Sequence, residues 1–220
     1  MINAQALVNP DLPVLRSKDD PVHALNLMDE CHVGHLAVVD NGKFLGLISE
    51  TMLLSAERII SSANGEMPLI PASVLPHEHL LEVLKTASEF HLTLVPVVDG
   101  DGNYQGAISL DTLIDNLSKY QSAGERGAII VLEMNALDYH LSQIARIVEE
   151  NDARILSFNS TPAQDISRME LHLKINKEDV NPILQSFERF GYDVKASYQE
   201  PVYTEDLKRR YDELMRYLNI

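Results

Sequence analysis

The sequence predicts an α+β protein in which two tandem β-α-β-β-α repeats precede a ferredoxin-like βαββαβ unit. Residues 36–40, a glycine-bearing turn and residues 46–49 return as residues 95–99, a second such turn and residues 106–109. Self-similarity in the same order marks an internal repeat. From about Gly127 onward the hydrophobic pattern changes, and it then predicts strands and helices in the order βαββαβ.

Each repeat is expected to open with a short strand and a helix. Apolar pairs follow prolines in both copies, at residues 14–15 and 74–75, and predict the strands. Acidic residues and proline come next, at residues 19–21 and 76–78, and favour the start of a helix. Near-helical spacing then predicts one buried face on each helix, made of Val22, Leu25, Leu27 and Met28 in the first copy and Leu80, Leu81, Leu84 and Ala87 in the second.

Each repeat is expected to close with a β-hairpin and a second helix. Two strands flank each glycine-bearing turn, and the helices begin after Ser49 and Ser109. One copy is too small to bury its own sheet. The two copies, at about residues 5–60 and 66–120, should therefore pack together as a domain of residues 1–123.

Residues 127–200 are predicted to form the second domain. Apolar runs and an alternating pattern predict strands at residues 128–132, 154–158, 169–175 and 194–198. Helices are expected between the first and second strands, where Leu141, Ile144, Ala145 and Val148 share a face, and at residues 180–190, where Gly191 ends the helix.

Residues 201–220 predict a last, amphipathic helix. Its apolar face contains Leu207, Tyr211, Leu214, Met215 and Leu218. This pattern is consistent with a helix that docks on its own domain and equally with one that reaches across to a partner chain.

Composition excludes several classes of function. Acidic residues outnumber basic ones 33 to 18, and residues 1–123 alone hold 16 acidic and 6 basic residues. Nucleic acid and anionic membrane surfaces both require a dense field of Lys and Arg, so neither is expected as a direct partner. Cys31 is the only cysteine, and no secretory leader or membrane span is visible, which predicts a soluble cytoplasmic protein.

No constellation of residues predicts catalysis, so the chain is not expected to be an enzyme. His77 and His79 are expected in a solvated turn, and His32 and His35 as structural imidazoles, so no metal site is predicted. Residues 99–103 alternate oxygen-bearing side chains with glycines as a calcium loop does, but a hairpin turn explains these glycines without calcium.

The sequence resembles the CBS-domain pair, or Bateman module, over roughly residues 5–120. The resemblance lies in the repeated order of a helix, an "hLPVVD"-like strand, a turn, a "GhIS" strand and an "LL"-type helix, where h is a hydrophobic residue. In that family an adenine nucleotide can lie in the cleft between the repeats, so AMP, ADP or ATP is a candidate ligand. A Ser or Thr hydroxyl reaches the phosphate there, and an Asp three residues later holds the ribose. The residues that the resemblance places around such a ligand are Arg16, His35, Leu36, Ala37, Ser49, Met52, Val95, Pro96, Ser109, Asp111 and Thr112.

The chain departs from the family pattern at the ribose position of both repeats. Met52 and Thr112 stand where the Asp is expected, and Ala37 replaces the proline that Pro96 keeps in the second repeat. The second half-site is therefore the better candidate. Ser49 and Ser109 have an alternative role, because serine also caps helices in the absence of any ligand.

The second domain resembles the ACT domain, most clearly over residues 140–158, and the whole arrangement is similar to regulatory proteins of the acetoin-utilisation type. The first loop of this domain lacks the glycine of amino-acid-binding members, so the domain is expected to serve as a dimerisation sheet. The alternative is an amino-acid site around Asn135 and Asp138. Together the resemblances imply a non-catalytic sensor that forms a homodimer and signals to an unknown regulated protein. The alternative is a ligand-free structural or dimerisation module that acts through a protein partner.

Overall fold

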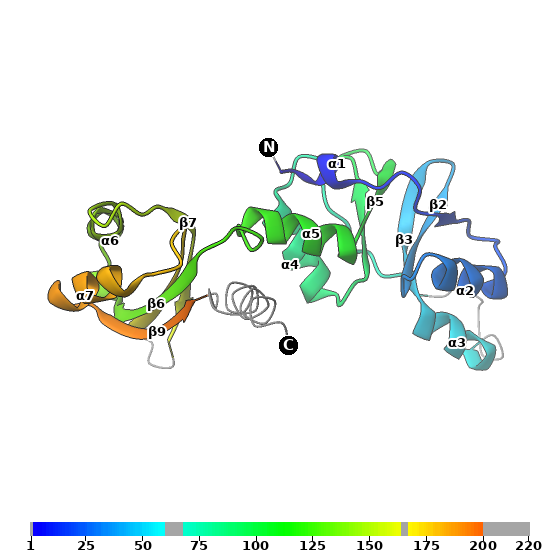
Figure 1. Cartoon of the computed structure of the whole chain (residues 1–220). Coiled ribbons are helices and arrows are strands. Elements are labelled where there is room, and N and C mark those ends of the chain that lie inside the picture. Colours follow the sequence, from blue (N-terminus) through cyan, green and yellow to red (C-terminus); the bar gives the residue numbers. More distant parts are fainter. Residues whose placement is uncertain (1, 60–67, 164–166, 200–220) are drawn as a thin grey trace, which may run out of the picture. The chain divides into compact units, whose positions relative to one another are not determined.

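The computed structural model describes residues 2–59, 68–163 and 167–199, so the helix expected at residues 201–220 lies outside the described residues. The chain divides into two compact units, Met1–Leu117 and Ser118–Ile220, and each is described by itself (Figure 1). No helix in the described part of the chain is both long and apolar enough to cross a membrane.

The first repeat consists of β1 (Val14–Leu15), α2 (Pro21–Glu30), β2 (His35–Asp40), β3 (Lys43–Ser49) and α3 (Glu50–Ile59). β1 pairs in parallel with β2, which pairs antiparallel with β3, so the predicted β-α-β-β-α order is confirmed. α2 begins as the sequence indicated, because the Asp20 side chain accepts the N–H of Val22 and Pro21 occupies the first turn.

The second repeat contains α4 (Leu80–Glu89), β4 (Leu94–Val98), β5 (Tyr104–Ser109) and α5 (Leu110–Tyr120). The strand predicted at residues 74–75 is wrong, since only Val74 pairs there, through a single parallel bridge to Val97. The Val74 N–H donates to the Pro96 carbonyl and the Val98 N–H donates to Val74. The next hydrogen bonds of a parallel ladder would need N–H groups on Pro76 and Pro96, and proline has none.

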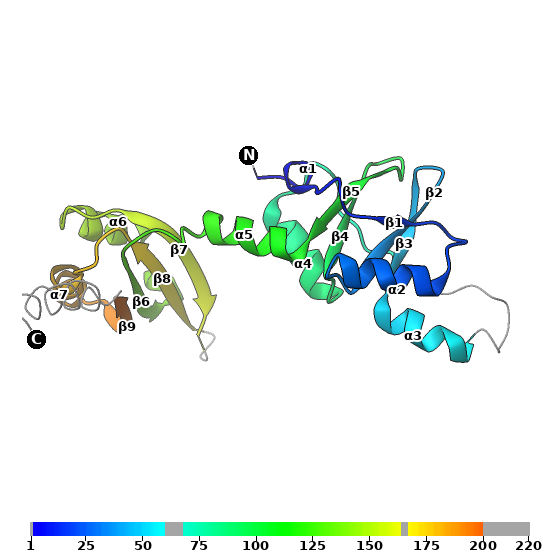
Figure 2. The same cartoon turned by 45° about the vertical axis from the view of Figure 1, so that its right-hand side comes forward.

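Each repeat receives an edge segment from outside itself. Residues 2–9, which include α1 (Ala4–Leu7), run along the second repeat, where Asn9 bridges to Ala107 and α1 lies beside β5 (Figures 1 and 2). Ile70 bridges to Leu47 of the first repeat in the matching position. Each repeat is therefore completed by the segment that precedes the other repeat in the sequence.

Glycines in β3 and β5 make room for these crossing segments. Gly46 and Gly106 have φ angles of +149° and +133°, and a Cβ would lie 2.5 Å from the Leu69 Cβ and 2.3 Å from the Val8 Cγ1 respectively. Both glycines lie where the hairpin register shifts, in β-bulges. A side chain at either position would push the crossing segment off the sheet.

The repeats also share a hydrophobic core. One cluster belongs to the first repeat alone and includes Leu36 and Ile48. The larger cluster combines the second repeat with Ala37 and Leu47 of the first repeat and with Leu7 of α1. The expectation that the two copies pack together is confirmed by this shared core.

The second unit contains β6 (Ala128–Asn135), the short 3₁₀ helix η1 (Ala136–Asp138), α6 (Leu141–Glu149), β7 (Ile155–Pro162), β8 (Arg168–Ile175), α7 (Asn181–Arg189) and β9 (Asp193–Gln199). Its sheet has the order β7-β8-β6-β9, with antiparallel neighbours throughout. The buried strand residues pack with residues of both helices, such as Ile144 and Phe187. This arrangement confirms the predicted ferredoxin-like βαββαβ unit.

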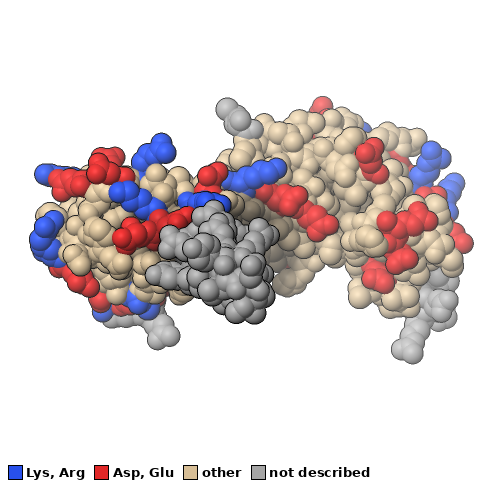
Figure 3. All heavy atoms as spheres, viewed as in Figure 1, with Lys and Arg blue, Asp and Glu red and all other residues tan. Residues whose placement is uncertain are grey.

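Charged side chains form a network across three strands of this sheet. Arg168 bridges Glu133 at 2.9 Å and Asp193 at 3.4 Å, while Lys195 bridges Glu133 at 3.2 Å and Glu170 at 2.5 Å. The hydrogen bond from Lys195 lowers the pKa of Glu170 and raises that of Lys195. Basic and acidic side chains accordingly interleave over the second unit in Figure 3.

Candidate ligand site between the repeats

The repeats meet at a pair of equivalent residues, Gly34 and Thr93. The Gly34 N–H donates to the Thr93 hydroxyl at 2.8 Å, and the Thr93 N–H donates to the His35 Nδ1 at 3.3 Å. A third contact of 3.1 Å joins the Thr93 Oγ1 and the His35 Nδ1. Because His35 pairs with Ser49 and Leu94 with Ser109 in the two hairpins, this junction brings one end of each hairpin together.

His35 is the imidazole that joins the repeats. Its Nδ1 accepts the Thr93 N–H, so the neutral ring carries its proton on Nε2. Burial lowers the pKa of His35 because the charged ring would lose its hydration. The Nε2 atom has no hydrogen-bond partner among the described residues and is left as a donor at the junction.

The second half-site lies at the start of α5. The Ser109 Oγ accepts the Thr112 N–H at 3.3 Å and lies 3.0 Å from the Thr112 Oγ1. The Leu110 N–H donates to the Thr93 carbonyl at 3.0 Å and ties this helix start to the repeat junction. Thr93 therefore links His35 by two hydrogen bonds to the start of α5, the helix that Ser109 caps.

The first half-site has the same construction at the start of α3. The Ser49 Oγ accepts the Met52 N–H at 3.2 Å and lies 2.9 Å from the Thr51 Oγ1, and the Glu50 N–H donates to the Gly34 carbonyl. Thr51 was missed in the sequence because it stands one position earlier than Thr112 does in the repeat. Met52 itself packs against the first repeat's core.

Both serines act as helix caps, which is the structural role that the sequence left open for them. A hydroxyl that accepts an N–H can still form further hydrogen bonds, because it has two lone pairs and one donor. The capping role and a ligand-binding role are therefore compatible at Ser49 and Ser109.

Other residues expected in the cleft are distributed differently. Leu36, Ala37, Val95 and Pro96 are buried, and their side chains belong to the packed strands. Arg16 lies at the other end of β2, because the neighbouring Ser17 hydroxyl donates to Asp40. β2 is six residues long, so its two ends are about 16 Å apart. The structure does not bring Arg16 to the half-sites.

The turn at residues 99–103 is held by its own side chains. Asp99 accepts hydrogen bonds from the backbone of Asp101 and Asn103 and from the side chains of Asn103 and Gln105. The side-chain bond from Asn103 is the main cause of the lowered pKa of Asp99. Four donors occupy the carboxylate that a calcium ion would need, which supports the interpretation as a hairpin turn.

The histidines near α4 do not form a metal cluster in the described residues. His79 caps α4 by accepting the Leu81 N–H, so the helix begins at Leu80, two residues after the expected segment, residues 76–78. No group of three or more His, Cys, Asp or Glu side chains in the described part of the chain is placed to hold a metal ion.

Tyr104 has a buried hydroxyl with no hydrogen-bond partner among the described residues. It starts β5, and its N–H donates to the Gly42 carbonyl where the two hairpin turns meet. Burial raises its pKa to about 12. The equivalent residue of the first repeat is Phe44, which has no hydroxyl.

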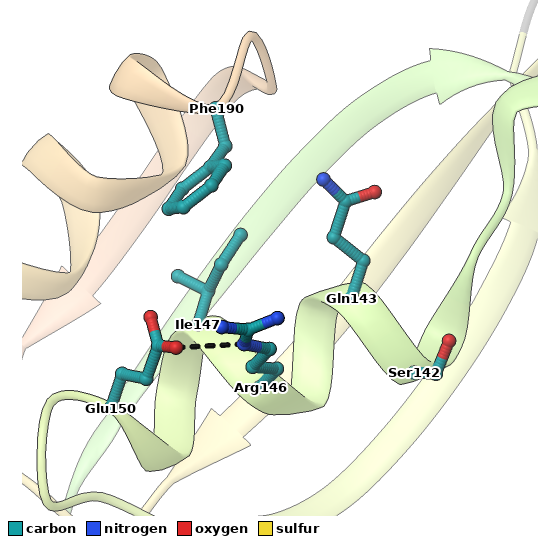
Figure 4. A pocket seen from close by; sticks show the side chains of 6 residues that line it. All are labelled: Ser142, Gln143, Arg146, Ile147, Glu150 and Phe190. Atoms are coloured by element: carbon teal, nitrogen blue, oxygen red, sulfur yellow. Dashed lines mark hydrogen bonds and ion pairs between the residues drawn. The ribbon is translucent and has the colours of Figure 1, made fainter.

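The second unit has a hollow of about 380 Å³ that includes Asn135 and Asp138, the two residues expected at an amino-acid site. Asn135 uses its side-chain oxygen to accept the Leu137 N–H. The hollow's Arg168 is paired with Glu133 and Asp193, which neutralise part of the positive charge that a ligand carboxylate would need. A second hollow of about 390 Å³ adjoins it and is lined by Ser142, Gln143, Arg146, Ile147, Glu150 and Phe190 (Figure 4).

Residues 4–58 and 68–119 match the family model described as the CBS domain. Among solved structures, the chain is similar to CBSX2 of Arabidopsis thaliana in complex with AMP. The two chains are 22% identical over 55% of this chain and 98% of that chain, with a TM-score of 0.47. A CBS domain pair/ACT domain protein from Thermotoga maritima is 18% identical over 54% of this chain and 98% of that chain, with a TM-score of 0.46. The CBS domain pair of a third protein, in complex with 5′-methylthioadenosine and S-adenosylmethionine, is 18% identical over 55% of this chain and 98% of that chain, with a TM-score of 0.45.

Proposed function

We propose that this chain, which contains a CBS domain pair within residues 4–119, is a non-catalytic regulatory protein that binds an adenine-containing molecule between its two repeats. The observation that supports this proposal is the junction at Gly34 and Thr93. There Thr93 hydrogen-bonds both to His35 of the first repeat and to the start of α5, the helix whose first turn carries the hydroxyls of Ser109 and Thr112.

Binding at this junction provides a direct route to regulation. A ligand that contacts His35 and Ser109 touches both repeats at once. Its binding energy therefore favours one arrangement of the two hairpins over others. A partner protein that contacts either helix start, at Glu50 or Leu110, would sense that change, because both N–H groups bond to the junction residues.

The competing function is a structural module that binds no small molecule. The capping of α3 and α5 by Ser49 and Ser109 favours it, since each serine accepts an N–H of the first turn and so has a role without a ligand. The two functions differ in one measurable property, the stabilisation of the native chain by a ligand.

Thermal unfolding of the full chain with a panel of compounds tests the proposal. The panel contains adenosine, AMP, ADP, ATP, NAD, S-adenosylmethionine and free amino acids. A compound that binds only the native state raises the melting temperature. At a concentration of 100 times its dissociation constant it adds about 2.7 kcal/mol to the free energy of unfolding. A shift with an adenine compound and none with amino acids is expected, and no shift with any adenine compound at millimolar concentration contradicts the proposal.

A homodimer is the second part of the proposal. Leu54 on α3 and Ile114 on α5 occupy equivalent positions and are 61% and 55% exposed, so each repeat presents a large apolar side chain on its second helix. A second copy is the partner with the same surface to match. Light scattering should give the mass of a dimer for the native chain and of a monomer for the double variant Leu54→Lys, Ile114→Lys, and a native monomer at micromolar concentration contradicts it.

A further inference from the structure

The contact between the repeats at Gly34 and Thr93 depends on a neutral histidine. The Thr93 N–H donates to the His35 Nδ1 at 3.3 Å, so this nitrogen carries no proton. The Thr93 Oγ1 accepts the Gly34 N–H and lies 3.1 Å from the same Nδ1, so the Thr93 hydroxyl can direct its own proton to it. One imidazole nitrogen of the first repeat therefore accepts hydrogen bonds from the second.

Protonation of His35 removes this acceptor. Both ring nitrogens of a charged imidazole are donors, so an Nδ1–H would face the Thr93 N–H and cannot accept the Thr93 hydroxyl proton. A donor that loses its partner away from water destabilises the contact to which it belongs. The charged ring is therefore incompatible with the present position of Thr93.

The same two residues hold the starts of two helices. The Leu110 N–H donates to the Thr93 carbonyl and the Glu50 N–H donates to the Gly34 carbonyl, both at 3.0 Å. Leu110 and Glu50 are the first residues of α5 and α3. A movement of Thr93 away from Gly34 therefore separates the two points at which these helices are anchored.

The repeats are joined a second time, at their hairpin turns. The Phe44 N–H donates to the Gly102 carbonyl and the Tyr104 N–H donates to the Gly42 carbonyl, at 3.0 and 2.9 Å. The turns themselves, residues 41–43 and 99–103, contain no histidine. Loss of the contact at His35 therefore leaves the repeats connected at the other end of the hairpins, and the change stays local.

The charged surroundings of His35 do not oppose this response. Burial lowers the pKa of His35 below its ordinary value of 6.5, and it is the one cause of the shift. The titratable residues at the ends of α2 and α4, in the turns after them and at the starts of α3 and α5 are exposed except for the partly buried Cys31. They are Glu30, Cys31, His32, Glu50, Glu89, His91 and Asp111.

We infer that the contact between the repeats is a pH-sensitive switch, in which protonation of His35 breaks the hydrogen bonds with Thr93 and loosens the starts of α3 and α5 while the hairpin turns stay joined. The switch is closed above pH 6.5 and opens as the pH falls below that value, because the folded protein binds the proton less readily than the unfolded chain does. It requires no small-molecule ligand, so it is independent of the proposed function.

Hydrogen exchange of the backbone amides of the full chain between pH 7.5 and pH 4.5 tests the inference, with each rate corrected for the intrinsic pH dependence of exchange. The protection of the Thr93, Glu50 and Leu110 amides should fall by roughly fivefold or more on acidification, because their acceptors belong to the switch. The protection of the Phe44 and Tyr104 amides should change by less than about twofold. In parallel, nitrogen NMR of the His35 ring should show an unprotonated Nδ1 at pH 7.5 that gains its proton over the range in which protection is lost.

His35→Asn should abolish the response, because the amide oxygen can accept the Thr93 N–H and gains no proton in this range. His91→Asn is the matched control, since His91 is exposed and has a φ angle of +52°, which asparagine tolerates. It removes a histidine from the turn before β4 and should leave the response intact.

Constant protection at Thr93, Glu50 and Leu110 in the native chain overturns the inference. So does an equal loss of protection at Phe44 and Tyr104, which would show general unfolding, or a loss that persists in His35→Asn. If that variant does not fold, the NMR titration of the native chain decides, since an Nδ1 that is protonated at pH 7.5 also overturns the switch.

Discussion

The hydroxyl of Tyr104 should destabilise the fold, because it is buried without a hydrogen-bond partner among the described residues. An unsatisfied buried polar group costs about 1–3 kcal/mol, so Tyr104→Phe should stabilise the first unit by up to that amount at neutral pH. The equivalent position already holds Phe44, which shows that the fold accepts a phenyl ring in this setting.

The same substitution should change the response to alkaline pH. The pKa of Tyr104 is raised by burial from 10.0 to about 12. A folded pKa above the unfolded value means that the stability is present below pH 10 and is lost as the pH rises through 12. Two pH units correspond to at most about 2.7 kcal/mol, and this loss should be missing from Tyr104→Phe.

Urea unfolding followed by circular dichroism between pH 8 and pH 11.5 measures both effects. Tyr198→Phe is the control, since Tyr198 is 62% exposed and its hydroxyl is not buried. A loss of 1 kcal/mol or more in Tyr104→Phe at pH 8 would show that the hydroxyl has a partner in solution. Parallel curves for the native chain and Tyr104→Phe at alkaline pH would refute the account of its pKa.

Three other predictions follow from named contacts. Thr112→Val should weaken ligand binding by about 0.5–1.5 kcal/mol, whereas Met52→Leu should change it little; calorimetry giving equal losses would reverse the choice of half-site. The stability of the first unit should fall as the pH drops below 6.5, because the pKa of His35 is lowered by burial and its protonation opposes folding; His35→Asn should flatten this slope in pH-dependent urea unfolding, and an unaltered slope would contradict the assignment. Gly106→Ala should destabilise the chain by about 1–3 kcal/mol because of its φ angle of +133° and its close approach, while Gly100→Ala, which faces open space, should be neutral in the same unfolding assay.

The repeat made most of the fold predictable. Each element of the two copies has a local signal, and two copies in the same order reinforce each other, as the hairpins before Ser49 and Ser109 illustrate. The strand expected at residues 74–75 failed because its pairing depends on the N–H groups of both strands, and Pro76 and Pro96 remove them.

Contacts between segments far apart in the chain could not be predicted from the sequence. Residues 2–9 show no pattern that assigns them to the second repeat, because their bridges to residues about 76 and 98 positions away depend on the packed fold. The same is true of the contact between His35 and Thr93, which no spacing rule predicts. Glycines are an exception, since Gly46 and Gly106 recur in both copies and mark the places where those segments cross.

The helix starts that carry the candidate residues were predictable from the sequence, whereas the placement of Arg16 was not. Ser49, Ser109 and Thr112 lie at the helix starts as expected, whereas Arg16 is at the other end of its strand. Thr51 was not predicted, because its hydroxyl contacts the capping serine from the second position after it, whereas Thr112 does so from the third.

Hydrogen exchange of backbone amides with and without saturating adenosine tests most directly whether a ligand binds at the junction of the repeats. Added protection is predicted at residues 34–36 and 93–95 and at the start of α5, residues 109–113, because these segments surround the donor of His35 and the hydroxyls of Ser109 and Thr112. Protection confined to residues 133–143 of the second unit, or no change anywhere, would contradict a ligand site between the repeats.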